Sequence, residues 1–154
     1  MSRSLHDAKA RAAAESDLRT SLRIEAGAGT GKTTALVRRV TALVKDGTPL
    51  SRIVAITFTE KAAGELRTRL RRRLEDEVRA TTDAITATRL REALFELDAA
   101  SISTIHGFCQ SLLRERPVEA GLDPGFEIEE EAASRARFDT VFARFLADAG
   151  DVDP

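Results

Sequence analysis

The sequence predicts an α/β protein in which short strands alternate with amphipathic helices around a parallel sheet. Three segments have the length and apolar composition of buried strands: residues 21–26 (SLRIEA), 53–58 (IVAITF) and 100–104 (ASIST). Each is followed by a segment of helical periodicity. In such folds a ligand lies at the carboxyl ends of the strands. Because three strands make a small sheet, we expect the sheet to be incomplete in this chain.

Helices are predicted wherever apolar residues recur at intervals of three and four. Segments with this pattern span residues 4–18, 34–44, 60–79, the stretch around Leu90, Leu94 and Leu97, 106–116 and 131–147. Residues 46–49 (DGTP) stop the helix of residues 34–44, and Pro117 stops the one that begins at His106. Residues 80–88 form a weak joint. The 131–147 helix is strongly amphipathic, so we expect its apolar stripe to pack against something.

Length and composition limit the class of protein. The chain has 154 residues, enough for about one domain with a single core. Its net charge of −1 argues against a strongly basic nucleic-acid binder, so contacts to DNA require local placement of charge. Its one cysteine, Cys109, cannot form an internal disulfide and is interpreted as a small core residue. Without a signal peptide or an apolar run of about 18 residues, the chain is expected to be cytoplasmic with no membrane contact.

Residues 24–34 (IEAGAGTGKTT) have the spacing of a P-loop. Glycines allow backbone N–H groups to turn toward an anion, Lys32 can reach the β and γ phosphates, and the Thr33 hydroxyl can bind Mg²⁺. The strict pattern is not met, because its first glycine would fall at Ala26. The alternative is a glycine-rich turn that only joins a strand to a helix. The predicted strand before the loop and the predicted helix after it favour the phosphate site.

Two further motifs follow the other predicted strands. Residues 55–70 read AITFTEKAAGELRTRL, and residues 102–113 read ISTIHGFCQSLL. Together with AGAGTGKTT they closely resemble motifs Ia, Ib and I of superfamily 1 DNA helicases of the UvrD/RecB type. The resemblance covers roughly residues 20–130 in the expected order. The forms TFTEKAA, TIHGFC and GLDPGFEIEEEAA (residues 121–133) resemble the RecB/AddA branch in particular.

The resemblance implies a RecA-like P-loop NTPase fold with flanking helices, and ATP and Mg²⁺ as cofactors. Lys32 would be the catalytic residue on the phosphates, and Thr33 would hold the metal. The residues that match the nucleotide-binding motif are Ala26, Gly27, Ala28, Gly29, Thr30, Gly31, Lys32, Thr33 and Thr34.

The resemblance also implies a path for single-stranded DNA along the second and third motifs. The matching residues are Thr57, Phe58, Thr59, Lys61, Thr104, His106 and Phe108. Threonine hydroxyls can donate to phosphate oxygens, and an exposed aromatic ring can stack on a base. Some of them have a simpler interpretation: Phe58 and Phe108 as core residues, and His106 as a histidine at a helix start. The arginine run of residues 67–73 is interpreted as a solvated helix face, with phosphate tracking as its functional alternative.

These observations lead to a functional hypothesis with two domains. Residues 1–130 are the N-terminal part of the first RecA-like ATP-binding domain of a helicase, and residues 131–154 begin a truncated helical insertion. The parent enzyme would move 3′ to 5′ on single-stranded DNA in recombination or repair, with the missing remainder of its chain and a RecBCD- or AddAB-like complex as partners. The chain lacks an apolar strand ending in Asp-Glu, so we expect it to be inactive alone. The alternative is a truncated, non-hydrolysing module that binds nucleotide and single-stranded DNA. A small P-loop kinase is disfavoured because it leaves TFTEKAA and TIHGFC unexplained.

Overall fold

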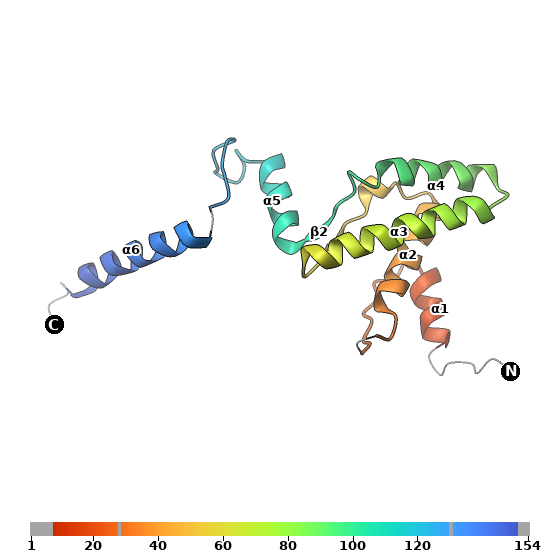
Figure 1. Ribbon diagram of the computed structural model, residues 1–154, viewed down its shortest axis with the longest axis horizontal. Helices are drawn as coiled ribbons and strands as arrows, with labels where there is room; N and C mark the ends of the chain where they lie inside the picture. Colours follow the sequence, from red (N-terminus) through yellow and green to blue (C-terminus); the bar gives the residue numbers. More distant parts are fainter. Residues whose placement is uncertain (1–7, 28, 130, 151–154) are drawn as a thin grey trace. The chain divides into compact units, whose positions relative to one another are not determined.

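The computed structural model describes residues 8–27, 29–129 and 131–150, and the chain divides into two compact units between Ser111 and Leu112. The first unit is helix-rich and contains a short parallel sheet (Figure 1). Its elements are α1 (Ala8–Ser16), α2 (Lys32–Asp46), a 3-10 turn η1 (Leu50–Arg52), β1 (Ala55–Thr57), α3 (Glu60–Ala80), α4 (Ala84–Glu96), β2 (Ile102–Thr104) and the start of α5 (Ile105–Glu115).

The sheet consists of β1 and β2, which pair in parallel. Ala55 lies opposite Ile102, and Thr57 lies opposite Thr104. Segments far apart in the sequence therefore end side by side at one edge of the sheet. The α/β expectation is confirmed at this level: a mixed, helix-rich structure with a small parallel sheet.

The core of this unit is made mainly by three helices. Helices α3 and α4 lie side by side in Figure 1, and α2 packs against both. The periodicity of α3 correctly predicted its buried stripe, which includes Leu66, Leu70 and Leu74. Leu90 and Leu97, on and just after α4, are fully buried against it. Each fully buried leucine of this kind contributes about 1.5–3 kcal/mol relative to an exposed one.

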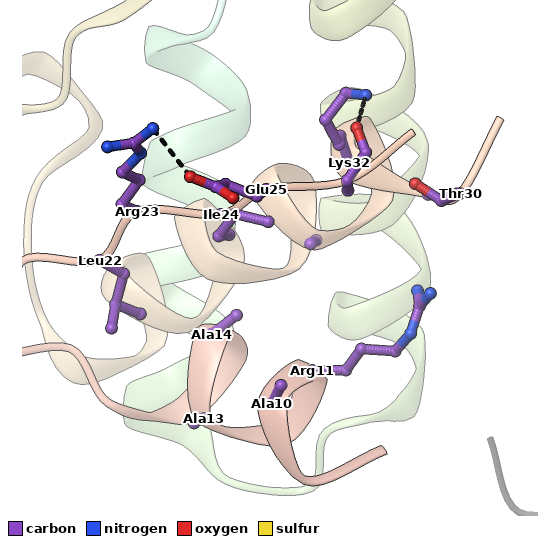
Figure 2. A pocket seen from close by; sticks show the side chains of 13 residues that line it. Ala10, Arg11, Ala13, Ala14, Leu22, Arg23, Ile24, Glu25, Thr30 and Lys32 are labelled. Atoms are coloured by element: carbon purple, nitrogen blue, oxygen red, sulfur yellow. Dashed lines mark hydrogen bonds and ion pairs between the residues drawn. The ribbon is translucent and has the colours of Figure 1, made fainter. Parts of the chain in front are cut away.

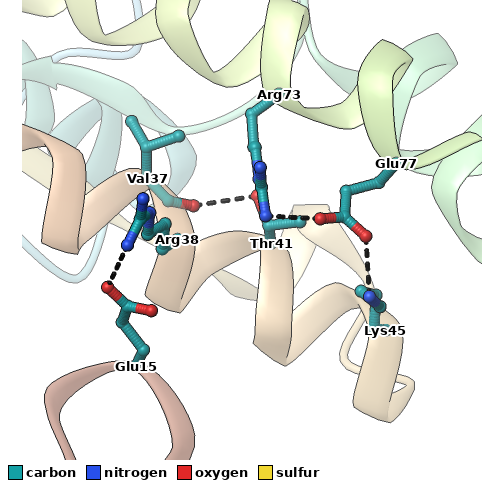
Figure 3. A network of polar contacts seen from close by, with 7 residues as sticks. All are labelled: Glu15, Val37, Arg38, Thr41, Lys45, Arg73 and Glu77. Carbon is teal, nitrogen blue, oxygen red and sulfur yellow. Dashed lines mark hydrogen bonds and ion pairs between the residues drawn. The ribbon is translucent and has the colours of Figure 1, made fainter. Parts of the chain in front are cut away.

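A polar bridge also joins α2 to α3. The Glu77 carboxylate accepts a hydrogen bond from Lys45 Nζ at 2.7 Å and pairs with Arg73 Nη2 at 2.5 Å (Figure 3). The hydrogen bond from Lys45 is the main cause that lowers the pKa of Glu77, and the charge of Arg73 acts in the same direction. One carboxylate thus fixes the two helices against each other.

Residues 21–26 were predicted to form a strand, and this prediction is wrong. The segment has no strand hydrogen bonding, and its apolar residues Leu22 and Ile24 are 39% and 47% exposed. An apolar segment becomes a strand only where a neighbouring backbone completes its ladder. Within the described residues, β1 and β2 pair with each other and not with this segment.

The joint predicted at residues 80–88 is shorter than expected, since α4 begins at Ala84. The signal that was missed is Asp83, whose carboxylate accepts a hydrogen bond of 2.8 Å from the Thr86 N–H. Aspartate in this position caps a helix N-terminus, because it satisfies a backbone donor that has no partner within the helix.

Two interpretations of side-chain burial are also corrected. Cys109 is exposed on α5 rather than part of the core. The arginine run of α3 is not simply a solvated face, because Arg67 Nη2 donates to the Ile102 carbonyl at 2.9 Å and Arg71 pairs with Asp98 at 2.7 Å. The long arginine side chain can leave the apolar stripe and still reach a partner on a neighbouring element.

The second unit contains the end of α5 and helix α6 (Glu131–Gly150). On α6, Phe138 stacks on Phe142 with ring centroids 5.7 Å apart. The apolar residues of this helix are exposed, so the expected packing of its stripe is not seen among the described residues: Phe138, Val141, Phe142, Phe145 and Leu146. None of the helices in the described ranges has the length and apolarity that crossing a membrane requires.

Candidate nucleotide and DNA site

The glycine-rich loop ends where α2 begins. Gly29 and Gly31 have φ angles of 74° and 96°, in the left-handed region that side chains with a Cβ rarely adopt. Gly31 is the N-cap of α2 and supplies no side chain to satisfy the first backbone donors of the helix. The loop therefore turns directly into an uncapped helix N-terminus, where free N–H groups and the helix dipole favour an anion.

Lys32, the first residue of α2, holds this loop closed. Its ammonium group donates hydrogen bonds to the carbonyl oxygens of Ala26 and Gly27, the latter at 2.8 Å. The Thr30 hydroxyl also donates to the Gly27 carbonyl, at 2.7 Å. An ammonium group has three donors, so one N–H remains after the two loop contacts. The arrangement leaves that donor for an external acceptor such as a phosphate oxygen.

Beside the loop lies a cavity of about 420 Å³. Its walls are α1, the extended segment of residues 22–26 and the start of α2, as Figure 2 shows. Six of its lining residues are small or apolar: Ala10, Ala13, Ala14, Leu22, Ile24 and Ala35. Arg23 and Glu25 pair with each other at 2.8 Å on its rim. This volume lies within the range of small-molecule pockets.

The other predicted nucleotide ligands occupy the same loop and the first turn of α2. Thr33 is exposed and Thr34 is half-buried or exposed to a similar degree as its neighbours on that turn. Ala28 lies outside the described residues. A hydroxyl at Thr33 and the loop donors are of the right chemical type for a Mg²⁺-bound triphosphate, because Mg²⁺ prefers oxygen ligands and usually binds together with the phosphates.

The second predicted cluster lies at the carboxyl edge of the sheet. Thr57 and Thr104 face each other in register at the ends of β1 and β2. Phe58, which follows β1, is 99% exposed, so its interpretation as a core residue is wrong. His106 and Lys61 are exposed, and Phe108 is half-buried. The structure therefore brings the second and third motifs together, with an aromatic ring and two polar side chains open to solvent.

The threonines at this edge make hydrogen bonds within the protein. Thr59 caps α3 by accepting from the Ala62 N–H at 3.1 Å, and the Thr57 hydroxyl donates to the Thr59 carbonyl at 3.0 Å. The buried Thr104 hydroxyl donates to Glu60 Oε1 at 2.9 Å and accepts from the Gly107 N–H at 3.2 Å. Sequence reasoning missed Glu60 as their partner. In this arrangement the hydroxyl protons of Thr57 and Thr104 are used to shape the edge, which leaves Phe58, Lys61 and His106 as the groups that can reach a ligand.

The loop and the sheet edge are not joined by strand pairing in the described residues. Nor do those residues contain a group of three or more histidine, cysteine, aspartate or glutamate side chains that could hold a metal by themselves. A glycine loop at a helix N-terminus, next to parallel strands, defines an anion-binding α/β protein.

Comparison with known proteins identifies the family. The chain matches the UvrD/REP helicase N-terminal domain over residues 6–151, and it belongs to this family. It is 37% identical over 131 residues to the AddA-type subunit of the ATP-dependent helicase/nuclease from Heliobacterium modesticaldum, a match that covers 82% of this chain. It is 40% identical over 112 residues to the protein of the same name from Exiguobacterium sibiricum, a match that covers 71% of this chain. The resemblance to the UvrD/RecB type, and to its AddA-like branch, is confirmed. The chain spans 9% of the length of each of these two relatives.

Proposed function

We propose that this chain is the N-terminal, ATP-binding portion of an ATP-dependent DNA helicase. The observation that carries the proposal is the loop in which Lys32 closes onto the carbonyls of Ala26 and Gly27 at the open N-terminus of α2. Family membership supports it, because the relatives are named ATP-dependent helicases. The full fold would be RecA-like, as the family implies, with further strands completing the sheet.

In this proposal the triphosphate of ATP lies against the loop and the first turn of α2. The backbone N–H groups there provide donors and a favourable dipole, and Lys32 supplies the third N–H of its ammonium. The Thr33 hydroxyl would bind Mg²⁺, which neutralises phosphate charge when present. The apolar cavity beside Thr30 and Gly31 would take the nucleoside, because the purine ring is the part of ATP that gains from leaving water.

Single-stranded DNA would lie along the carboxyl edge of β1 and β2. Phe58 would stack on a base, while Lys61 and His106 would approach phosphates. Thr57, Thr59 and Thr104 belong to this surface, and Thr59 and Thr104 hold the starts of α3 and α5 through their hydrogen bonds. Phe108, half-buried on α5, would support this surface from behind. The parent enzyme would then translocate 3′ to 5′ in recombination or repair, within an AddAB-type complex in the cytoplasm.

Calorimetric titration with Mg²⁺-ATP tests the nucleotide site. We expect the wild-type chain to bind, and Lys32→Ala to weaken binding by about 100-fold, because truncating a charged partner leaves the phosphate charge uncompensated. Lys9→Ala, which removes an exposed lysine from α1, is the matched control and should bind like wild type. Equal affinity of Lys32→Ala and wild type would refute the site. Circular dichroism of each variant establishes that its helices are intact.

A further inference from the structure

Arg39 makes an unusual set of contacts from α2. Its guanidinium Nη1 donates to the carbonyl oxygens of Ala14 at 3.0 Å and Asp17 at 2.7 Å, and its Nη2 donates to the carbonyl of Thr20 at 3.1 Å. The side chain is half-buried. One arginine therefore binds three backbone carbonyls from a different part of the chain. Arg39 lies about two helical turns after Lys32, on the helix that begins at the loop.

These carbonyls belong to the segment that builds the wall of the cavity. Ala14 is in the last turn of α1, where carbonyl oxygens have no partner within the helix. Asp17 and Thr20 lie in the connection from α1 to the extended residues 22–26. Both α1 and residues 22–26 line the cavity, whereas Arg39 does not. Arg39 thus fixes two walls of the cavity to the helix that forms the third.

The neighbouring Arg38 provides a contrast within the same helix. Arg38 also contacts α1, but through an exposed ion pair with the Glu15 side chain at 2.8 Å (Figure 3). Exposed ion pairs of this kind contribute little, and they do not fix a backbone. The planar fork of Arg39 directs several donors at once, which the single ammonium of a lysine cannot do. Of the two arginines, Arg39 determines where α1 and its following segment lie.

We propose that Arg39 is a positioning residue for nucleotide binding, which sets the separation of α1 from the loop and so the fit of the nucleoside in the cavity. The inference rests on the proposed function, since it assumes that ATP binds at the loop. Its specific content is a division of labour. The phosphates depend on the loop and Lys32, and the nucleoside depends on the walls that Arg39 holds.

The test compares ATP with inorganic tripolyphosphate, each with Mg²⁺, in calorimetric titrations of the full chain. Tripolyphosphate has the phosphate groups without the nucleoside, so it does not need the cavity. We expect Arg39→Lys to weaken ATP binding about tenfold, the effect of losing one or two buried hydrogen bonds, and to leave tripolyphosphate binding unchanged. Arg38→Lys, the matched control on the same helix, should leave both affinities unchanged.

Other outcomes separate the inference from the proposed function. Loss of both ligands in Arg39→Lys, or loss of neither, would refute the positioning role while leaving the loop as the phosphate site. Failure of the wild-type chain to bind either ligand would refute the nucleotide site, and the role of Arg39 with it. Hydrogen exchange gives an independent measure: the amides of α1 should exchange faster in Arg39→Lys, with those of α3 unchanged. Wild-type exchange in α1 would overturn the proposal.

Discussion

Thr104 and Glu60 are joined by a hydrogen bond of 2.9 Å that links the end of β2 to the start of α3. The same Thr104 hydroxyl accepts from the Gly107 N–H in the first turn of α5. Thr104 is therefore the N-cap of α5 and a bridge between the two motifs at the sheet edge. Because its proton is donated to Glu60, Thr104 holds this edge in shape.

The bridge predicts an effect on stability. Thr104→Val keeps the shape of the side chain but removes the hydroxyl, so the Gly107 N–H loses its cap and Glu60 loses its donor. We expect the free energy of unfolding, measured by urea denaturation, to fall by about 1–2 kcal/mol. Thr104→Ser retains the hydroxyl and is the control. A valine variant as stable as the serine variant would show that the bridge does not contribute.

Phe58 predicts an effect on DNA affinity. Its ring is 99% exposed beside the paired ends of β1 and β2, where a base could stack on it. We expect Phe58→Ala to weaken binding of a fluorescent oligo-dT strand about 5–150-fold, since stacking contributes about 1–3 kcal/mol per base. Phe95→Ala is the control, because Phe95 is 91% exposed on α4, away from this edge. Fluorescence anisotropy showing equal affinities for the two variants would argue against stacking at Phe58.

Glu77 predicts how stability depends on pH. Its hydrogen bond from Lys45 and the charge of Arg73 lower its pKa in the folded chain. A lowered pKa means that the contribution is present above the pKa of the unfolded chain and is lost as pH falls through the lower, folded pKa. We expect Glu77→Gln to cost about 1 kcal/mol at pH 7, because the pair is partly solvated, and to lose less stability than wild type below about pH 5.

Urea denaturation at a series of pH values measures this difference. Glu65→Gln, on the same helix, removes an exposed carboxylate 3.9 Å from Arg69 and should follow the wild-type pH dependence. If Glu77→Gln and Glu65→Gln give the same curve, the bridge between α2 and α3 does not depend on the ionised carboxylate.

The sequence also predicts that this chain alone does not hydrolyse ATP. The loop can position phosphates, but an Asp-Glu motif that activates water and arginines from a second domain are absent from the sequence. These groups typically contribute about 10²–10⁴ and about 10³–10⁵ in rate. We expect phosphate release with single-stranded DNA to stay at the level of Lys32→Ala. Turnover that is lost in Lys32→Ala would contradict this and would direct attention to Glu60, Glu127 and Glu129.

Periodicity identified the helices, but it could not identify the partners of polar or extended residues. The stripe of Leu66, Leu70 and Leu74 was predictable, because a spacing of four residues places these side chains on one face of a helix. The segment of residues 21–26 was not, because strand formation depends on a neighbouring backbone that its own sequence does not encode.

The candidate site shows the same division. The glycine loop and the motifs after β1 and β2 were identified from their residues, since phosphate binding and base stacking need particular side chains at fixed spacing. The roles of Glu60 and Arg39 were not predictable, because both act through contacts with segments distant in the sequence. Local spacing carries no information about such contacts.

The central claim is that ATP binds where the glycine loop enters α2, and site-resolved NMR tests it most directly. Amide spectra of the ¹⁵N-labelled chain would be recorded during titration with Mg²⁺-ATP. We predict the largest shifts at the loop and the first turn of α2, at Gly27, Gly29, Gly31, Lys32 and Thr33. Smaller shifts should appear at Ala13 and Ile24 along the cavity. Saturable shifts confined to α3, α4 or α6, with the loop amides unchanged, would contradict the account.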